Sequence, residues 1–452
     1  MTSLEHELAS ILPDGAVAAP TDEYLADPMG RGLRGSADAV CFPETAEEVA
    51  QIVAWCYGHD VPITPRGGGT GLAGGAIPDG GVVLCLERLA RVRSFEPLLW
   101  RMNVEAGVAT GTIHRLAREN GLRFPPDPGA WEVSQIGGNI ACNAGGPHAF
   151  KYGVTGRWVT GIEAVVPPGE IVRVGGAVRK DVAGYDIRSL LVGSEGTLGI
   201  VTAAWLRLMP APEAELPLVA FARDTASGCA ALEAVLGSGV FPAAVEYLDG
   251  VTLSFAAPSF PGPVPDGAGF LVAVEVDGSR AEAEQALREL QDALAGEALA
   301  TWMPSAPAEV AELWRWRAGV AFSILAQKGG AISEDVAVPL DRLQEAIEET
   351  LAIAARRGVV GLSFGHAGDG NIHSTFLFSP GDPDEAARVE RACGDLFELA
   401  IRLEGTVTGE HGIGLLKAGQ LARQWSPAAV DLHRRIKQVF DPKGLLNPGK
   451  KN

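Results

Sequence analysis

Apolar residues recur along the chain with two different periods, and these periods predict where helices and strands lie. Helical spacing covers residues 46–57, 112–120, 226–236, 280–294, 308–327 and 340–357. Short apolar or alternating runs predict strands at residues 61–64, 82–86, 103–105, 162–166, 171–174, 216–221, 244–248, 269–276, 331–338 and 359–364. Thr45-x-x-Glu48 is a capping box for the first of these helices, and Gly121 is a C-cap for the second.

The order of these elements predicts two folded parts and the α+β fold class. Helices and strands alternate up to about residue 210, where a polar, Pro-rich stretch (A-P-E-A-E-L-P) follows. Beyond it, a βαββαβ rhythm is typical of a ferredoxin-like α/β domain. We therefore expect an N-terminal helix and arm over residues 1–35, one domain over 36–212, a second over 213–405, and a C-terminal helical segment over 406–452.

Residues 124–161 interrupt the pattern, because they show neither period. They are rich in Gly, Pro and Asn, yet Trp131, Ile136, Ile140 and Phe150 argue against disorder. Long irregular stretches inside compact domains are usually functional. We expect this stretch to wrap a ligand without regular structure.

Composition narrows the function classes. A chain of 452 residues needs more than one core. The net charge of -19 argues against nucleic acid or an anionic membrane as a general partner. Six scattered cysteines without a C-x-x-C pair argue against an iron–sulfur cluster, a zinc knuckle or a disulfide framework, and fit reduced thiols in the cytoplasm. No apolar run is long enough to span a bilayer.

The densest chemical signal is the loop V-P-I-T-P-R-G-G-G-T-G-L-A-G-G-A-I-P, residues 61–78. Glycine lets backbone approach a ligand closely, and successive N–H groups can cradle a phosphate. Gly69-x-Gly71-x-x-Gly74 matches the nicotinamide-dinucleotide fingerprint, but that motif requires a helix to open from the loop. Here a strand follows instead, so we interpret the loop, beside Arg66, as a phosphate cradle of another kind.

A second constellation combines G-H-A-G-D-G-N-I-H, residues 365–373, with G-E-H-G, residues 409–412. A strand–turn–strand brings His366 and His373 to one place, and Glu410 and His411 lie in a Gly-flanked loop. Two imidazoles and a carboxylate are the usual ligands of a zinc-like divalent metal. The alternative is a buried, hydrogen-bonded histidine pair without a metal. Asp369 is read as a turn residue.

A third element is the helical L-W-R-W-R, residues 313–317. Trp314 and Arg317 share one helix face at i, i+3. An arginine held among tryptophans can present its planar fork to a carboxylate. The alternative is a solvated arginine on an amphipathic helix.

Together these motifs resemble one known family. P-R-G-G-G-T-G-L, P-P-D-P-x-x-x-x-x-S-x-x-G-G-N, N-A-G-G, G-S-E-G-T-L-G-I-V-T, G-H-A-G-D-G-N-I-H, G-E-H-G-I-G and D-P-K-G-L-L-N-P-G-K occur in this order over about residues 36–452. The chain is similar to FAD-dependent dehydrogenases of the vanillyl-alcohol oxidase/p-cresol methylhydroxylase superfamily. Within it, the chain most resembles the D-2-hydroxyacid dehydrogenases, which act on D-lactate or D-2-hydroxyglutarate or form the flavin subunit of glycolate oxidase.

The resemblance implies a two-subdomain FAD-binding domain over residues 36–212, a ferredoxin-like cap domain over 213–405, and a C-terminal segment that returns to the FAD. The residues it implies around the cofactor are Arg66, Gly67, Gly68, Gly69, Thr70, Gly71, Leu72, Pro126, Asp127, Ser134, Gly137, Gly138, Asn139, Asn143, Gly145, Gly146, Gly196, Ile200 and Asn447. Some relatives attach FAD through a histidine near the Gly-rich loop. Thr70 stands in this loop and no histidine does, so we expect non-covalent FAD.

For the chemistry, the resemblance implies a divalent metal, zinc or manganese, on His366, His373 and Glu410. It places His411 beside the substrate carbon as the base and Arg317 on the substrate carboxylate. The 2-hydroxyglutarate enzymes carry an amide where this chain has Thr375, and residues 330–333 lack their basic residue. This departure favours a small monocarboxylate such as lactate.

We expect oxidation of a small D-2-hydroxy acid to the 2-oxo acid, with electrons passed to an external acceptor: a quinone, an electron-transfer flavoprotein, a cytochrome or a partner subunit. The alternatives are a D-2-hydroxyglutarate dehydrogenase, a flavin subunit of a glycolate-oxidase-like complex, and a metal hydrolase. The hydrolase reading leaves the Gly-rich segments unexplained. The oligomeric state is open, with a homodimer among the choices.

Overall fold

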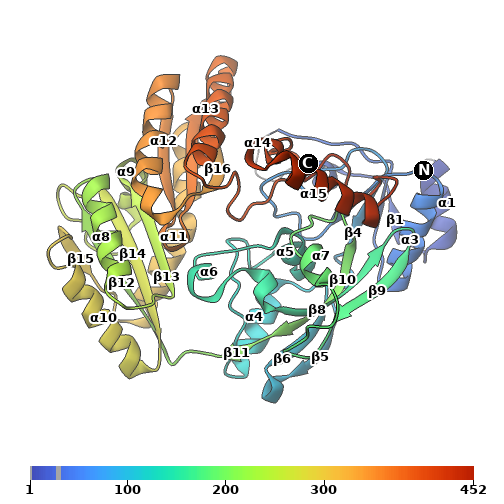
Figure 1. The fold of residues 1–452 in the computed structure, drawn as a ribbon, viewed down its shortest axis with the longest axis horizontal. Helices are drawn as coiled ribbons and strands as arrows, with labels where there is room; N and C mark the ends of the chain where they lie inside the picture. Colours follow the sequence, from blue (N-terminus) through green and yellow to red (C-terminus); the bar gives the residue numbers. More distant parts are fainter. Residues whose placement is uncertain (1–2, 27–31, 452) are drawn as a thin grey trace. The chain divides into compact units, whose positions relative to one another are not determined.

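The computed structural model describes residues 3–26 and 32–451, which form two compact units. Unit 1 comprises Met1–Gly146, Gly153–Ala211 and Glu410–Asn452, and unit 2 comprises Pro147–Tyr152 and Pro212–Gly409. Parts of the predicted N-terminal arm, residues 1–2 and 27–31, lie outside the described residues. Helices and strands are mixed in both units, as the α+β prediction requires (Figure 1).

The first sheet of unit 1 is small and partly parallel. Its strand order is β1-β2-β4-β3, from β1 (Val17–Ala18), β2 (Ala39–Cys41), β3 (Ile63–Arg66) and β4 (Val82–Cys85). Thr45 caps helix α3 (Ala46–Gly58): its Oγ1 accepts a hydrogen bond from the Glu48 N–H at 3.1 Å, as predicted. The reciprocal half of the predicted capping box differs, because Glu48 Oε2 accepts from the Glu44 N–H at 2.7 Å and not from Thr45. The helix leads directly into β3, and β3 leads into the Gly-rich loop.

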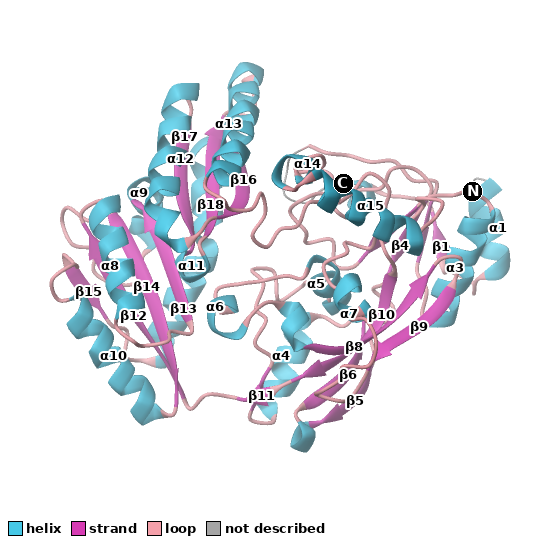
Figure 2. Ribbon diagram, in the orientation of Figure 1, coloured by secondary structure: helices cyan, strands magenta, loops and turns pink. Residues whose placement is uncertain are grey.

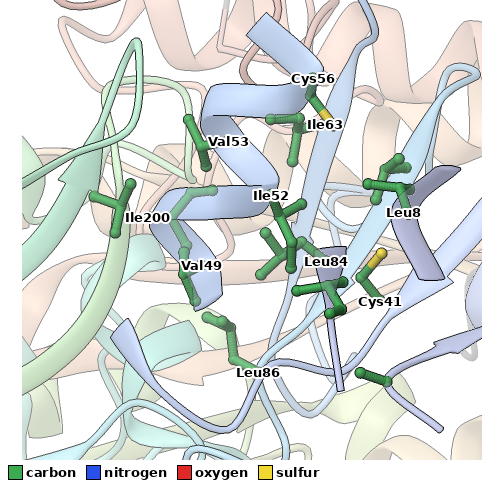
Figure 3. Packing of buried hydrophobic residues seen from close by; sticks show 14 of the residues in the cluster. Leu8, Cys41, Val49, Ile52, Val53, Cys56, Ile63, Leu84, Leu86 and Ile200 are labelled. Carbon is green, nitrogen blue, oxygen red and sulfur yellow. The ribbon is translucent and has the colours of Figure 1, made fainter. Parts of the chain in front are cut away.

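The core behind this loop is built from the apolar faces of α1 (Ser3–Ile11), α3 and the small sheet. Figure 3 shows Leu8, Ile52, Ile63 and Leu84 meeting there, all with no exposed surface. Burying such side chains contributes about 1.5–3 kcal/mol each. The start of the Gly-rich loop is therefore held on a rigid support.

The second sheet of unit 1 is antiparallel, in the order β5-β6-β10-β8-β9. Its strands are β5 (Val92–Glu96), β6 (Arg101–Glu105), β8 (Val159–Val166), β9 (Glu170–Gly175) and β10 (Ile200–Arg207). The predicted hairpin at residues 162–174 is confirmed by the β8–β9 pair. The remaining α-helices and strands described in unit 1 are α2 (Asp22–Leu25), α4 (Thr110–Glu119), β7 (Leu122–Arg123), α5 (Ile136–Cys142), α7 (Ile187–Leu191), β11 (Met209–Pro210), α14 (Leu421–Gln424) and α15 (Pro427–Phe440).

One expectation was wrong here: residues 124–161 are not uniformly irregular. They contain α5 and, in unit 2, α6 (Ala149–Tyr152). Helix α5 reads I-G-G-N-I-A-C, and its two glycines have poor helix propensity. Buried Ile136 and Ile140 pack one face of α5, and this tertiary packing outweighs the local preference.

Unit 2 is organised around one seven-stranded sheet, in the order β15-β12-β14-β13-β17-β18-β16 (Figure 2). The strands are β12 (Ala214–Ala222), β13 (Ala244–Asp249), β14 (Phe270–Gly278), β15 (Ala300–Trp302), β16 (Gly330–Ala337), β17 (Val360–His366) and β18 (Asn371–Phe378). The first four strands have the 4-1-3-2 order of a ferredoxin-like motif. The last three form a partial second motif, and β13 pairs with β17 at the seam.

Helices cover both faces of this sheet. One face carries α8 (Thr225–Gly237), α10 (Arg280–Leu294), α12 (Leu343–Arg357) and α13 (Pro383–Arg402). The other carries α9 (Gly250–Ala256) and α11 (Pro307–Lys328). Because helices cover both faces, polar side chains on the central strands of this sheet are removed from water. Charged residues at these positions therefore need partners.

Candidate functional site

The Gly-rich loop begins where β3 ends, and Arg66 closes over it. Gly69 has φ +67°, and a Cβ there would lie 2.3 Å from Arg66 Nη2. Arg66 is 7% exposed, and no ion pair among the described residues involves it. A buried guanidinium over a glycine backbone is a suitable place for an anion.

The loop faces the start of α5. A Cβ at Gly67 would lie 3.4 Å from the Gly138 backbone nitrogen, and one at Gly68 would lie 2.9 Å from the Val133 carbonyl oxygen. In contrast, Cβ atoms at Gly71 and Gly138 would meet no protein atom within 4 Å. The loop and the helix therefore border open space that is lined by backbone.

Some of the other residues predicted around the cofactor hold α5 in place, and others line the open space. Asn139 Nδ2 donates to Thr110 Oγ1 at 2.7 Å, and Thr110 Oγ1 lies 3.0 Å from Ser134 Oγ. These three buried side chains brace α5. Asn143, with φ +55°, ends α5 and accepts a hydrogen bond from the Gly156 N–H at 2.8 Å.

Gly137 and Gly146 are glycines for packing reasons. A Cβ at Gly137 would lie 2.6 Å from Ala106 Cβ, and one at Gly146 would lie 2.3 Å from the Asp127 carbonyl oxygen. The neighbouring Pro126 carbonyl oxygen is 2.8 Å from His114 Nε2. These positions shape the wall of the open space.

The C-terminal tail closes the same side of unit 1. Glu195, in the turn before β10, has φ +52° and accepts hydrogen bonds from the N–H groups of Ile413 and Gly414 at 2.9 and 2.6 Å. Asn447 Nδ2 donates to the carbonyl oxygens of Gly75 and Glu195 at 2.8 and 2.7 Å. Asn447 therefore lies beside the Gly-rich loop.

The remaining predicted residues of unit 1 lie around these. Gly196 has φ +71° and packs on Pro65, while a Cβ at Gly145 would lie 2.7 Å from Glu410 Oε2. Glu410, in the loop after Gly409, therefore lies against the N-A-G-G segment within unit 1, and His411 follows it in that loop. Ile200 is the first residue of β10, and Thr70 and Leu72 lie within the loop itself.

Several buried polar atoms of this unit have no hydrogen-bond partner within the described part of the chain: Thr64 Oγ1, Gln135 Oε1, Asn447 Oδ1 and Lys450 Nζ. Lys450 is 3% exposed, and burial lowers the pKa of its ammonium group to about 8, against the opposing effect of Asp79. Buried polar groups are normally satisfied, so these atoms indicate a polar ligand: the amide oxygens of Gln135 and Asn447 need a hydrogen-bond donor, and the Lys450 ammonium suits an anionic group. Gln135 and Lys450 were missed in the sequence, although both stand inside the quoted motifs.

Unit 2 gathers a different set of side chains at the seam of its sheet. Glu246 on β13 is the cross-strand partner of His366 on β17, and Asp335 on β16 is the partner of His373 on β18. His366 Nδ1 lies 2.5 Å from Glu246 Oε1. The two imidazole rings are 5.2 Å apart and nearly perpendicular. The predicted strand–turn–strand is confirmed, and Asp369 lies in its turn.

Arg317 joins this cluster from α11. Its Nη2 is 2.5 Å from Glu246 Oε2, and its guanidinium lies over the Phe364 ring at 5.3 Å. Arg317 is 9% exposed, so it is not the solvated arginine of the alternative reading. Burial alone would raise the pKa of Glu246, but Arg317 and His366 hold that pKa at about 2. Glu246 is therefore an anion that links both groups.

Asp335 fixes the start of the G-E-H-G motif within unit 2. It accepts hydrogen bonds from Thr408 Oγ1 and from the Gly409 N–H, each at 2.8 Å. Asn371 Nδ2 also donates to it, at 2.6 Å. The chain is thus anchored beside His373 up to the residue that precedes Glu410.

Glu246 and Asp335 were both missed in the sequence. Glu246 is an acidic residue inside an otherwise apolar run, a position where an unpaired charge would cost several kcal/mol, whereas Asp335 follows Ser333 and Glu334 and stands out less. An acidic residue in an apolar run was the signal by which the sequence could have identified Glu246.

Comparison with known proteins gives matches over most of the chain. Residues 37–175 match the family model "FAD binding domain", and residues 211–451 match "FAD linked oxidases, C-terminal domain". Glycolate oxidase subunit GlcD of Bacillus subtilis (strain 168) is 37% identical over 91% of this chain and 88% of its own length. D-lactate dehydrogenase of Anaerostipes hadrus is 30% identical over 95% and 92%. D-2-hydroxyglutarate dehydrogenase of Xanthomonas citri pv. viticola is 34% identical over 91% and 88%.

Solved structures agree on the fold. A p-cresol methylhydroxylase with substrate bound aligns with TM-score 0.79 at 17% identity, covering 99% of this chain and 96% of its own. An alkyldihydroxyacetonephosphate synthase aligns with TM-score 0.76 at 18% identity, covering 98% and 85%. Among the described residues, none of the helices is both long and apolar enough for a membrane crossing.

Proposed function

The chain belongs to the FAD-linked oxidases, and on that premise we propose that it oxidises a small D-2-hydroxy acid of the lactate type to the 2-oxo acid. The observation that carries the proposal is the buried Glu246, which holds both His366 and Arg317. A histidine for a metal and an arginine for a carboxylate are the two groups that such a substrate needs side by side.

Unit 1 has the features needed to hold non-covalent FAD. The open space at Gly71 and Gly138 admits a flat or extended group, and the Arg66 guanidinium and Lys450 ammonium can neutralise its phosphates or its electron-rich ring. The buried polar atoms of Gln135 and Asn447 would find partners there. Bound FAD would supply the acceptor for the hydride that leaves the substrate.

For the metal, we propose His366, His373 and Glu410 as ligands, with zinc or manganese as the ion. A histidine that donates Nδ1–H to a carboxylate is held with its Nε2 lone pair directed elsewhere, which is the usual arrangement of metal-binding histidines. Glu410 follows Gly409, which Asp335 fixes beside His373. A bound divalent ion would supply charge that lowers the pKa of the substrate hydroxyl.

The protein residues would divide the chemistry between them. Arg317 would pair with the substrate carboxylate while Glu246 holds its guanidinium in place. His411 would take the hydroxyl proton, because an imidazole can accept a proton near neutral pH. Its position between glycines, with a Cβ at Gly412 only 2.8 Å from Glu195 Oε1, restrains the loop that carries it.

The substrate class rests on Thr375. Its Oγ1 donates to Ser333 Oγ at 2.9 Å, so two neutral hydroxyls satisfy each other at this register of β16 and β18. A second carboxylate would need an amide or a cation in this place. We therefore favour a monocarboxylate over 2-hydroxyglutarate. The second candidate is a flavin subunit of a glycolate-oxidase-like complex, favoured by the likeness to GlcD, and in either case the electrons would pass to an external acceptor.

The test is anaerobic bleaching of the flavin absorbance by D-lactate, glycolate, D-2-hydroxyglutarate and their L-counterparts, before and after chelation. We expect D-lactate or a similar monocarboxylate to bleach rapidly, and bleaching to be lost with chelator and restored by zinc or manganese. His366→Ala should lose the metal-dependent part, while His59→Ala, an exposed histidine in unit 1, should not. A yellow protein that none of these acids bleaches would refute the proposal, and purification without flavin would refute the family premise.

A further inference from the structure

A pocket lined by arginines lies on the antiparallel sheet of unit 1. It has a volume of about 170 Å³ and is lined by Leu99, Trp100, Arg101, Thr160, Ala177, Arg179 and Arg207. All of these residues belong to unit 1. The pocket contains three guanidinium groups and no carboxylate, in a chain whose net charge is -19.

Arg101 pairs with Glu96 at 2.7 Å, but Arg179 and Arg207 have no ion pair among the described residues, in contrast to other arginines on the same sheet. Arg93 bonds Glu105 and Glu163, and Arg173 bonds Glu163 at 2.8 Å. At the other end of the sheet, Arg207 is the direct cross-strand partner of Arg101. Like charges in this position are destabilising, and Glu96 offsets the charge of Arg101 only, so Arg207 is left without a carboxylate among the described residues.

Arg207 is the centre of the imbalance. Its guanidinium stacks on Trp158 at 4.5 Å, its Nε is buried without a hydrogen-bond partner, and no ion pair among the described residues includes it. Burial lowers its pKa, and the positive charges of Arg157, Arg179 and Arg188 lower it further. The group that would offset this cost is therefore an anion from outside the chain.

The walls of the pocket are held in place. Arg101 Nη1 donates to the Ala177 carbonyl oxygen at 3.1 Å, while its Nη2 is engaged by Glu96 at 2.7 Å outside the lining. Arg179 lies over the Trp100 ring at 5.1 Å. Trp100 has φ +51°, a backbone conformation that a bulky residue rarely adopts, and it lines one wall of the pocket. Such strain is kept where the surrounding structure requires it.

The pocket is separate from the cofactor cradle. Strand β10 begins at Ile200, next to the turn that holds the C-terminal tail, and ends at Arg207. Seven residue steps at about 3.3 Å each place the two ends roughly 23 Å apart. A ligand at Arg207 therefore occupies a second site.

We propose that this pocket binds a compact oxyanion with two negative charges, such as a phosphate group or a small dicarboxylate. Arg207 and Arg179 would donate to its oxygens, since guanidinium forks match phosphate and carboxylate geometry. The volume of about 170 Å³ is sufficient for an anion of this size.

The test uses the FAD-loaded protein with inorganic phosphate and with malonate, against chloride at equal ionic strength. Calorimetric titration and thermal unfolding would measure binding, and the flavin spectrum would report any binding at the cofactor. We expect saturable binding of one or both divalent anions, a rise in the unfolding temperature, and an unchanged flavin spectrum. Binding of phosphate alone or malonate alone would identify which oxyanion the pocket selects.

Two variants and one control make the result specific. Arg207→Gln should raise the Kd at least about tenfold, because a lost charge-assisted hydrogen bond is worth about 1.5–3 kcal/mol. It should also raise the unfolding temperature in the chloride buffer without phosphate or malonate, since it removes like-charge repulsion. Arg179→Gln, at an exposed position, should weaken binding without affecting folding. Arg173→Gln, which removes the same charge from the same sheet, should leave the Kd unchanged. Absence of saturable binding, or equal losses in Arg207→Gln and Arg173→Gln, would overturn the proposal.

Discussion

Substitution of Gly138 tests the cofactor cradle most directly, because two expected effects have opposite signs. Gly138 lies inside α5 with an ordinary helical φ, and a Cβ added there would meet no protein atom within 4 Å. The same added methyl would project into the space that we assign to FAD. Gly138→Ala should therefore stabilise the FAD-free protein and weaken FAD binding.

Both magnitudes follow from the local geometry. Alanine in place of a helical glycine stabilises a helix by about 0.5–1 kcal/mol. A methyl group forced into a filled site costs about 1–3 kcal/mol, which corresponds to a Kd increase of roughly 5- to 150-fold. Urea unfolding of the FAD-free protein measures the first effect, and quenching of FAD fluorescence on titration measures the second.

Gly137→Ala is the matched control, one residue earlier in the same helix. Its Cβ would lie 2.6 Å from Ala106 Cβ, so the substitution should destabilise the FAD-free protein by about 1–3 kcal/mol. If Gly138→Ala bound FAD as tightly as the unaltered protein does, the open space at Gly138 would not be part of the cradle.

Three further predictions concern buried charges. Glu246→Gln should cost about 3–5 kcal/mol in urea unfolding, because Arg317 and His366 would lose their buried anion, and metal affinity should fall 10- to 100-fold. The FAD-free protein should become more stable from about pH 8 to pH 10. In this range Lys450 is deprotonated in the folded state and protonated in the unfolded state, so raising the pH favours the folded state by at most about 3 kcal/mol. Lys450→Met should abolish this gain in urea unfolding. Glu195→Gln should cost about 1.5–3 kcal/mol and speed proteolysis of residues 410–452.

Each of these has a contrary outcome. A loss below 1 kcal/mol for Glu246→Gln would mean that the cluster is open to water. A stability curve in Lys450→Met that still rises between pH 8 and 10 would assign the proton to another group. Unchanged proteolysis in Glu195→Gln would show that the tail is held by other contacts.

Local patterns in the sequence were sufficient for most elements of the fold. The helix predicted over 280–294 coincides with α10, because Ser279 and Glu282 form a reciprocal capping box at its start. The βαββαβ rhythm led to the ferredoxin-like order of the first four strands in unit 2. The antiparallel pairing of β13 with β17 was not predictable, since it joins residues 120 positions apart with no local signal.

The candidate site divides in the same way. Motifs with dense glycine or paired histidine pointed to the Gly-rich loop, His366 and His373, because these residue types are unusual in those contexts. Glu246 was not found, since its role depends on the pairing of β13 with β17. Lys450 was not found either, because only the fold shows that its ammonium group is buried without a partner.

The proposed FAD cradle and the proposed oxyanion pocket each contain an arginine that has no carboxylate partner among the described residues, unlike other arginines of the chain. Arg317 has its carboxylate in Glu246, and Arg93 has two in Glu105 and Glu163, so neither needs an external anion for its stability. Arg66 and Arg207 have none among the described residues, although the chain carries 56 acidic residues against 37 lysines and arginines. Because acidic residues are in excess, the lack of a carboxylate beside these two arginines does not result from a shortage of acids. The absence of a carboxylate partner for Arg66 and Arg207 lowers the free energy of unfolding. An anion that binds the folded protein would raise that free energy again.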